Sequence, residues 1–161
     1  MSKWLGWIEE FIVVITLVSM SIIAFSNVLT RNFLDLSLAF TEEITINLFV
    51  FLTFVGAAIG VRRGAHLGFS LIIERVPLPI RRSLVVLIGF ISLALFLFIT
   101  YFGIDMIQFQ IDINAKTPAL GWPKWLFSLS IPIGSLLCAI RTIEATVKQL
   151  RELSYEQGES A

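Results

Sequence analysis

Long runs of apolar residues, interrupted by short charged segments, dominate the chain. An α-helix needs ~18–20 mostly apolar residues to cross the hydrocarbon core of a bilayer. Four runs approach or exceed this length, the last once Pro123–Trp125 are counted with it: Phe11–Leu29, Ile44–Val61, Leu84–Tyr101 and Leu126–Ile140. We therefore predict an all-α integral membrane protein with four transmembrane helices. The predicted helices cover about residues 8–30, 42–63, 82–113 and 123–150.

The basic residues are distributed unevenly between the two ends of these helices. With four crossings, the N-terminus, the loop between the second and third helices and the C-terminus share one side of the membrane. That side carries nine Lys and Arg residues and the other carries three. The positive-inside rule therefore predicts that both termini are cytoplasmic. The residues expected to anchor the helices in the headgroup region are Trp4, Trp7, Trp122, Trp125, Arg62 and Arg63.

A short segment between the second and third helices has an amphipathic pattern of its own. Residues 67–76 separate three aliphatic side chains from Glu74 and Arg75. This pattern predicts a short interfacial helix on the cytoplasmic surface. Residues 1–153 are therefore expected to form a single four-helix membrane domain, and residues 154–161 a flexible C-terminal tail. The end of the third helix, from Ile104 to Ile113, is also amphipathic and extends that helix beyond its apolar run.

Composition agrees with a membrane protein and excludes several functions. The chain is 57% hydrophobic and 15% charged, with a net charge of zero. A soluble domain is typically ~45–50% apolar and ~25% charged. Zero net charge gives no case for nucleic acid as a partner. One cysteine, Cys138, and one histidine, His66, cannot make a disulfide within the chain, a metal cluster or a pair of axial haem ligands. We expect no cofactor and no enzymatic activity.

The centres of the first three apolar runs contain no ionisable residue. Acidic residues gather near run ends instead, at Glu9, Glu10, Glu42, Glu43 and Asp105. A proton- or sodium-coupled carrier usually needs an ionisable group or a broken helix at the membrane midplane. Pro132 interrupts the fourth run, which contains no ionisable residue, and we interpret it as a packing feature. The pattern therefore argues against a self-sufficient carrier.

Two small sets of residues are candidates for helix assembly. The first is a polar pair across the short loop after the first helix, in which Arg31 would meet Glu42 or Glu43. The second is the seam formed by Gly56 and Gly60, because small residues four apart let another helix approach closely. That seam would serve either packing within this domain or docking of another subunit.

Several segments of the chain together resemble a known family. They are Asn27–Arg31, Phe40–Glu43, Phe54–Ala58, Arg62–Leu67, Thr117–Leu120, Pro123–Trp125 and Ser130–Gly134. In their order and spacing the chain resembles the small membrane subunit of tripartite ATP-independent periplasmic (TRAP) transporters, the DctQ-like family. The resemblance covers roughly residues 27–141. Many relatives carry Trp at the position of Phe40 and an acid at that of Ser70, so no acidic role is transferred to Ser70.

The resemblance implies a function that composition alone does not give. Such a subunit supports a large permease subunit that holds the substrate and sodium sites, while a periplasmic binding protein delivers an organic acid. It implies a scaffold in the bacterial inner membrane, in contact with its lipids. The residues on the outer rim that could contact the binding protein are Asp105, Gln108, Asp112 and Lys116.

Two other functions are alternatives to this one. A self-contained small multidrug-type carrier also has four helices, but it needs a membrane-embedded acid, which residues 11–29 lack. The membrane anchor of a redox enzyme needs axial histidines inside its helices.

Overall fold

The computed structural model describes residues 3–34, 38–62 and 77–159, and helices dominate these ranges. The helices are α1 (Lys3–Leu34), α2 (Ala39–Arg62), α4 (Leu78–Asp112), α5 (Lys124–Ser128) and α6 (Ser130–Glu159). Four of the described helices are long and apolar enough to cross a membrane, with candidate spans at Gly6–Phe33, Ala39–Arg62, Ile80–Asp112 and Lys124–Tyr155. The all-α prediction and the four long apolar helices are therefore confirmed.

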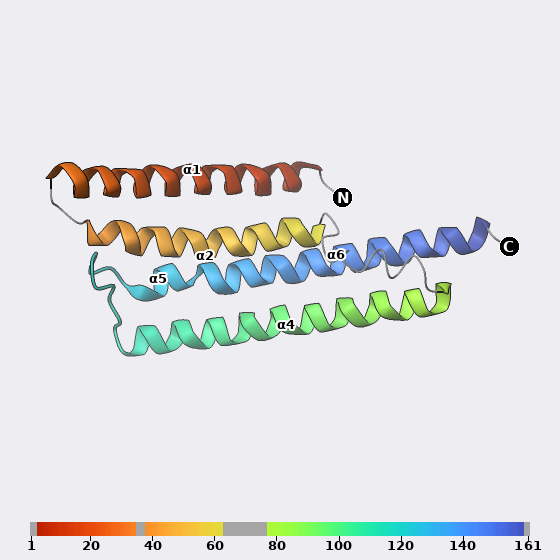
Figure 1. Cartoon of the computed structure of the whole chain (residues 1–161). Coiled ribbons are helices and arrows are strands. Elements are labelled where there is room, and N and C mark those ends of the chain that lie inside the picture. Colours follow the sequence, from red (N-terminus) through yellow and green to blue (C-terminus); the bar gives the residue numbers. More distant parts are fainter. Residues whose placement is uncertain (1–2, 35–37, 63–76, 160–161) are drawn as a thin grey trace.

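The long helices lie side by side in the order α1, α2, α6 and α4 (Figure 1). The extensive contacts between long helices follow this order, since α1 packs on α2, α2 on α6 and α6 on α4. Only 6% of the most apolar stretch within Gly6–Phe33 of α1 is buried, against 44% within Lys124–Tyr155, which covers α5 and most of α6. The helices thus form a layer with α6 inside it rather than a closed bundle, and most of the apolar surface remains available to lipid or to another membrane protein.

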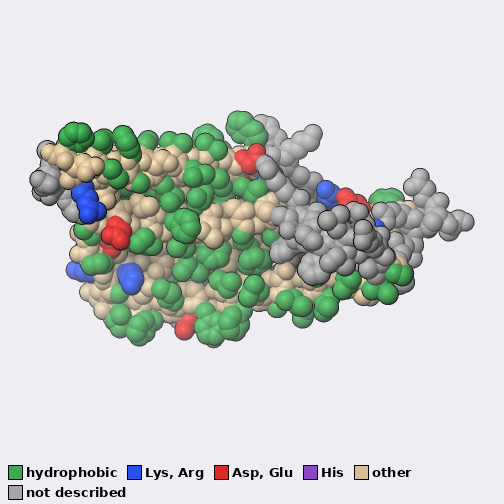
Figure 2. Space-filling model, in the orientation of Figure 1, with side chains coloured by type: hydrophobic (Ala, Val, Ile, Leu, Met, Phe, Trp, Pro, Cys, Tyr) green, Lys and Arg blue, Asp and Glu red, His purple; other side chains and the backbone are tan. Residues whose placement is uncertain are grey.

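Hydrophobic side chains cover much of the face shown in Figure 2, where the long helices run across the view. Large apolar residues on α1 and α4 are more than half exposed, among them Phe25, Phe90 and Phe98. In water this surface would be costly, but a lipid environment is itself apolar and removes that cost. The acidic and basic side chains seen in this view lie mainly toward the two ends of the long helices.

Small and polar residues close the interfaces of α6 with its two neighbours. A Cβ atom on Gly134 of α6 would collide with the Cβ atom of Phe54 on α2, and one on Gly103 of α4 would lie 3.3 Å from Cδ of Pro132. The hydroxyls of Thr100 and Ser135 are 2.8 Å apart across the α4–α6 interface. Close backbone approach and hydroxyl bonds are the usual means of packing helices in membranes.

The C-terminal part of the chain differs from the prediction in two respects. The predicted helix 123–150 is divided into α5 and α6, because the Pro132 ring has no N–H and would clash with the carbonyl of Ser128, four residues earlier. In addition, α6 continues to Glu159, so residues 154–159, expected as flexible tail, are helical. Leu153 is buried near the end of α6, and Arg82 of α4 donates to the Ser154 hydroxyl. Packing on α4 therefore extends the helix.

Two sequence predictions fall outside the described residues. They are the interfacial helix at residues 67–76 and the anchor Arg63, and His66 lies in the same gap.

Candidate functional site

Charged residues from three helices meet where the N-terminal part of α1, the C-terminal end of α2 and the middle of α6 come together. Arg141 of α6 donates from Nε to Oε1 of Glu9 on α1, at 2.6 Å, and its Nη1 binds Glu144 one turn further along α6. Glu9 and Arg141 are only 4% and 6% exposed. The two charges therefore neutralise each other inside the protein.

Arg62 joins the same cluster from the end of α2. Its Nη2 atom lies 2.8 Å from Oε1 of Glu10, and its Nε atom lies 3.4 Å from Oε2 of Glu9. Gly6, one turn before Glu10, leaves room for this guanidinium, since a Cβ atom there would strike it. Removing an ion from water costs several kcal/mol unless a partner compensates. The cluster therefore holds α1, α2 and α6 in one arrangement at this end.

The sequence contained only an indirect sign of this cluster. In the sequence, Glu9 and Arg141 border apolar runs, and Arg62 is a predicted interfacial anchor. All three lie at the ends of predicted apolar runs, which the predicted topology places on one side of the membrane. That topology brings them to the same level, but which acid meets which base depends on the order of the helices in the layer.

A compact loop forms the other end of the molecule, between α4 and α5. Its backbone folds back on itself through hydrogen bonds from Thr117 N–H to Trp122 O, at 2.8 Å, and from Gly121 N–H to Thr117 O, at 3.0 Å. Gly121 has a φ of 67°, a conformation that favours glycine. Glu43 of α2 accepts a hydrogen bond from Leu120 N–H at 3.1 Å and so ties the loop to α2.

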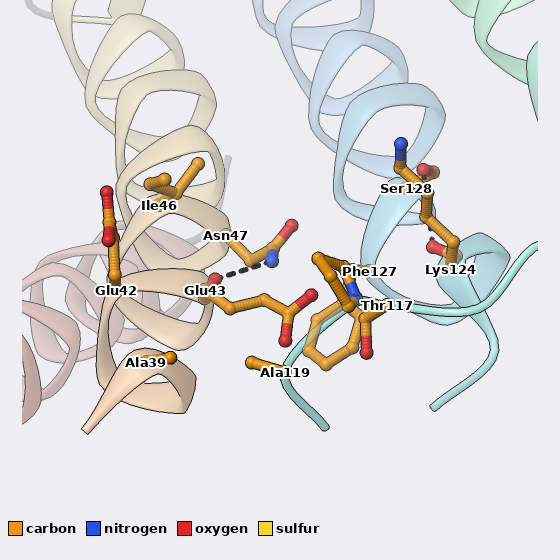
Figure 3. Close-up of a pocket in the computed structure, with 11 residues that line it drawn as sticks. Ala39, Glu42, Glu43, Ile46, Asn47, Thr117, Ala119, Lys124, Phe127 and Ser128 are labelled. Atoms are coloured by element: carbon orange, nitrogen blue, oxygen red, sulfur yellow. Dashed lines mark hydrogen bonds between the residues drawn. The ribbon is translucent and has the colours of Figure 1, made fainter. Parts of the chain in front are cut away.

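A pocket of about 510 Å³ lies between the start of α2, this loop and α5 (Figure 3). The side chains of Glu43 and Asn47 extend from α2 into the space facing Phe127, whereas Glu42 points away on the other side of α2. The residues that line the pocket are Ala39, Glu42, Glu43, Ile46, Asn47, Thr117, Pro118, Ala119, Lys124, Phe127 and Ser128. Acidic, basic, amide and apolar groups thus share one cavity.

The predicted polar pair takes a different form. Among the described residues no ion pair joins Arg31 to Glu42 or to Glu43, and the Arg31 side chain is exposed. The Glu43 carboxylate binds the loop instead. The pattern of side chains in a sequence does not show which backbone N–H group a carboxylate will bind. The sequence therefore indicated only the nearest cation, Arg31.

The glycine seam lies on a surface. Gly56 is exposed, and a Cβ atom added there would meet no other atom within 4 Å. Phe49, Thr53 and Ala57 are exposed beside it on α2, and Gly60 is half-buried. In the layer, Gly56 therefore does not pack against the other described helices, whereas Gly134 and Gly103 do.

The predicted rim and anchor residues are mostly accessible. Asp105, Gln108 and Asp112 are exposed along the end of α4, and Lys116 is exposed in the loop. Trp7 and Trp122 are 74% and 53% exposed, and Trp125 is half-buried. The side chain of Trp4 lies outside the described residues. Within the part of the chain that the structure describes, no group of His, Cys, Asp and Glu could hold a metal ion.

Known proteins are similar to this chain in amino-acid sequence. Residues 20–152 match the family model described as "Tripartite ATP-independent periplasmic transporters, DctQ component". The ectoine TRAP transporter small permease protein TeaB of Halomonas elongata is 28% identical over 89% of this chain and 74% of its own length. The C4-dicarboxylate TRAP transporter small permease protein DctQ of Rhodobacter capsulatus is 36% identical over 68% of this chain and 48% of its own length.

A third relative is much longer than this chain. The sialic acid TRAP transporter permease protein SiaT of Haemophilus influenzae is 26% identical over 98% of this chain but only 24% of its own length. The counterpart of this chain is therefore one part of a larger permease there. The match to the family model covers most of the sequence, including all of α2, α4 and α5. The chain belongs to the DctQ family and is the small, non-enzymatic permease component of a bacterial TRAP transporter.

Proposed function

We propose that this chain is a scaffold subunit that supports the large permease subunit of its transporter in the bacterial inner membrane. The large subunit would move an organic acid, delivered by a periplasmic binding protein, into the cell together with sodium ions. Both termini of the chain would face the cytoplasm. The names of the relatives mention ectoine, C4-dicarboxylates and sialic acid. Since these substrates differ, we assign substrate choice to the other two components.

The observation that carries the scaffold role is the fused relative. In SiaT, a counterpart of nearly the whole chain makes up about a quarter of a longer permease. Covalent fusion keeps two membrane segments in one assembly, which supports association of this chain with a large subunit. The apolar runs agree with a supporting role, because no Asp, Glu, Lys, Arg or His lies within residues 11–29, 44–61, 84–101 or 126–140. An ion pathway would be expected to place such a group at mid-membrane depth.

The exposed face of α2 is the surface that we assign to the large subunit. Gly56 lies there in open space, with Thr53 and Ala57 exposed beside it. Small residues let the backbone of a second helix come close, which strengthens dispersion contacts in the absence of a hydrophobic driving force. The open layer supports this assignment, because the other described helices leave this part of α2 uncovered.

Co-purification with the large subunit tests this surface. Gly56→Leu adds a bulky side chain where the isolated chain has free space, so the chain itself should fold normally while the complex is lost. Ala94→Leu is the matched control, since Ala94 is an exposed small residue on α4. Loss of the large subunit with Gly56→Leu alone supports the proposal. An intact, active complex with Gly56→Leu would contradict the assignment of this face.

A further inference from the structure

The pocket beside Glu43 lies at the depth where lipid headgroups would be found. The span that begins at Ala39 has 24 residues. A helix of this length is roughly 36 Å long, at 1.5 Å per residue. The hydrocarbon core is ~30 Å thick, so the ends of α2 reach the polar region of the bilayer. The start of α2 and the loop after α4 therefore present the pocket to headgroups rather than to acyl chains alone.

The polar lining of the pocket has acceptors on one side and a cation on the other. Glu43 uses Oε2 to hold the Leu120 N–H. Among the described residues, no hydrogen bond is made to its Oε1 atom. Asn47 donates its amide to the Glu43 carbonyl at 2.7 Å, which leaves the Asn47 Oδ1 atom as a further acceptor. Lys124 lines the same pocket from α5, and its side chain is exposed.

The remaining lining is apolar and matches the rest of a lipid molecule. Ile46 and Phe127 contribute large apolar side chains to the walls, and Ala39 and Ala119 contribute small ones. The volume of about 510 Å³ falls within the ~300–1,000 Å³ of typical small-molecule sites. A ligand that fits this lining carries an N–H cation, an anion a short distance away, and an apolar part.

We propose that this pocket binds the headgroup of a phospholipid with a primary amine, of the phosphatidylethanolamine type. The ammonium group donates to Glu43 and Asn47, and the phosphate lies toward Lys124. The start of the acyl chains contacts Ile46 and Phe127. A bound lipid of this kind would fill the gap between α2 and the loop. The proposal concerns this chain alone and does not depend on the scaffold role.

The headgroup chemistry predicts a definite order among lipids. Phosphatidylcholine has a quaternary ammonium without N–H donors and loses the hydrogen bonds to Glu43. Phosphatidylglycerol has no ammonium group, so it leaves the Glu43 carboxylate without a donor. We expect the amine lipid to be retained about tenfold more than either, which is the scale of a charge-assisted hydrogen bond.

Native mass spectrometry of the full-length chain with an equimolar mixture of the three lipids measures this preference. Glu43→Gln should reduce the preference to near unity, while the Gln side-chain carbonyl still accepts the Leu120 N–H. Lys124→Gln is a second variant, because the side chain of Lys124 makes no hydrogen bond among the described residues; it should weaken retention of the amine lipid. Asp105→Asn is the matched control, since Asp105 is an exposed acid on α4 outside the pocket.

The possible results separate clearly. Selective retention that Glu43→Gln abolishes and Asp105→Asn preserves supports the proposal. Equal retention of all three lipids, or a preference that Glu43→Gln does not reduce, overturns it. Displacement of the lipid by soluble glycerophosphoethanolamine at equal concentration would assign the pocket to a free amine phosphate ester and would also overturn the lipid assignment.

Discussion

Arg141 of α6 binds Glu9 of α1 although α2 lies between these two helices in the layer (Figure 1). The Nε atom of Arg141 is 2.6 Å from Oε1 of Glu9, and both side chains are buried. Along most of its length α1 packs on α2, and few of its other side chains are buried. This ion pair therefore fixes the position of α1 relative to a helix that it does not otherwise contact extensively.

Replacing Glu9 with Gln should lower the stability of the isolated chain. The change leaves the buried Arg141 with one carboxylate partner, Glu144, and weakens the hold on Arg62. Breaking a buried ion pair from one side typically costs about 3 kcal/mol or more. The free energy of unfolding in detergent, followed by circular dichroism, measures this loss.

Glu152→Gln is the control for this experiment. Glu152 is an exposed acid that lies 3.8 Å from Lys148 on the surface of α6. Such a surface pair contributes at most about 1 kcal/mol. The double variant Glu9→Gln with Arg141→Gln should recover part of the loss, because no uncompensated arginine remains at the pair. Equal effects of Glu9→Gln and Glu152→Gln would show that the buried cluster does not hold the helices together.

Two glycines in apolar runs, Gly134 and Gly56, should differ in how replacement by alanine affects the stability of the chain. Gly134→Ala should destabilise the chain by about 1–3 kcal/mol, because the new Cβ atom collides with the Cβ atom of Phe54 on α2. Gly56→Ala should not destabilise it, because the space is open and alanine favours the helix. Thermal unfolding of both variants of the isolated chain measures the difference. A larger loss with Gly56→Ala would mean that α2 packs through its glycine face.

The apolar runs predict where the helices lie along the chain, but they do not predict which helices pack against each other. Hydrophobic length is a local property, so α2 and α4 lie within a few residues of their predicted bounds. The partners of Glu43 and Glu9 depend instead on which helices are neighbours. Glu43 meets a backbone N–H of Leu120, and Glu9 meets an arginine far along the chain. Neither contact follows from the spacing of residues in the sequence. Spacing favoured Arg31 as the partner of Glu43, but no ion pair joins these two among the described residues.

The loop between α4 and α5 should loosen when its tie to α2 is removed. Glu43→Ala deletes the acceptor of the Leu120 N–H, so that amide should exchange its hydrogen faster. Glu43→Gln keeps an acceptor and should preserve slow exchange. Glu42→Ala is the neighbouring control, because the Glu42 side chain points away from the loop (Figure 3). Hydrogen–deuterium exchange of the segment 113–123 measures the effect, and unchanged exchange in Glu43→Ala would show that the loop is rigid without this bond.

Reversing the charges at the end of α4 should weaken uptake that depends on the binding protein. Asp105 and Asp112 are exposed on the part of α4 that the predicted topology places outside the cytoplasm. If they attract the binding protein, Asp105→Lys with Asp112→Lys slows association, and electrostatic steering changes such rates by about tenfold or more. Uptake by the complete transporter in proteoliposomes, measured against binding-protein concentration, should then show a higher half-saturating concentration and an unchanged maximal rate.

The ionic strength gives this last prediction a second test. Exposed charges are screened within a Debye length of about 8 Å at physiological salt, so added salt should raise the half-saturating concentration of the unmodified transporter and affect the variant less. Glu152→Lys changes an exposed acid at the opposite end of the molecule and should leave uptake unchanged. If the double variant keeps the same half-saturating concentration at low salt, the acidic rim of α4 does not contact the binding protein.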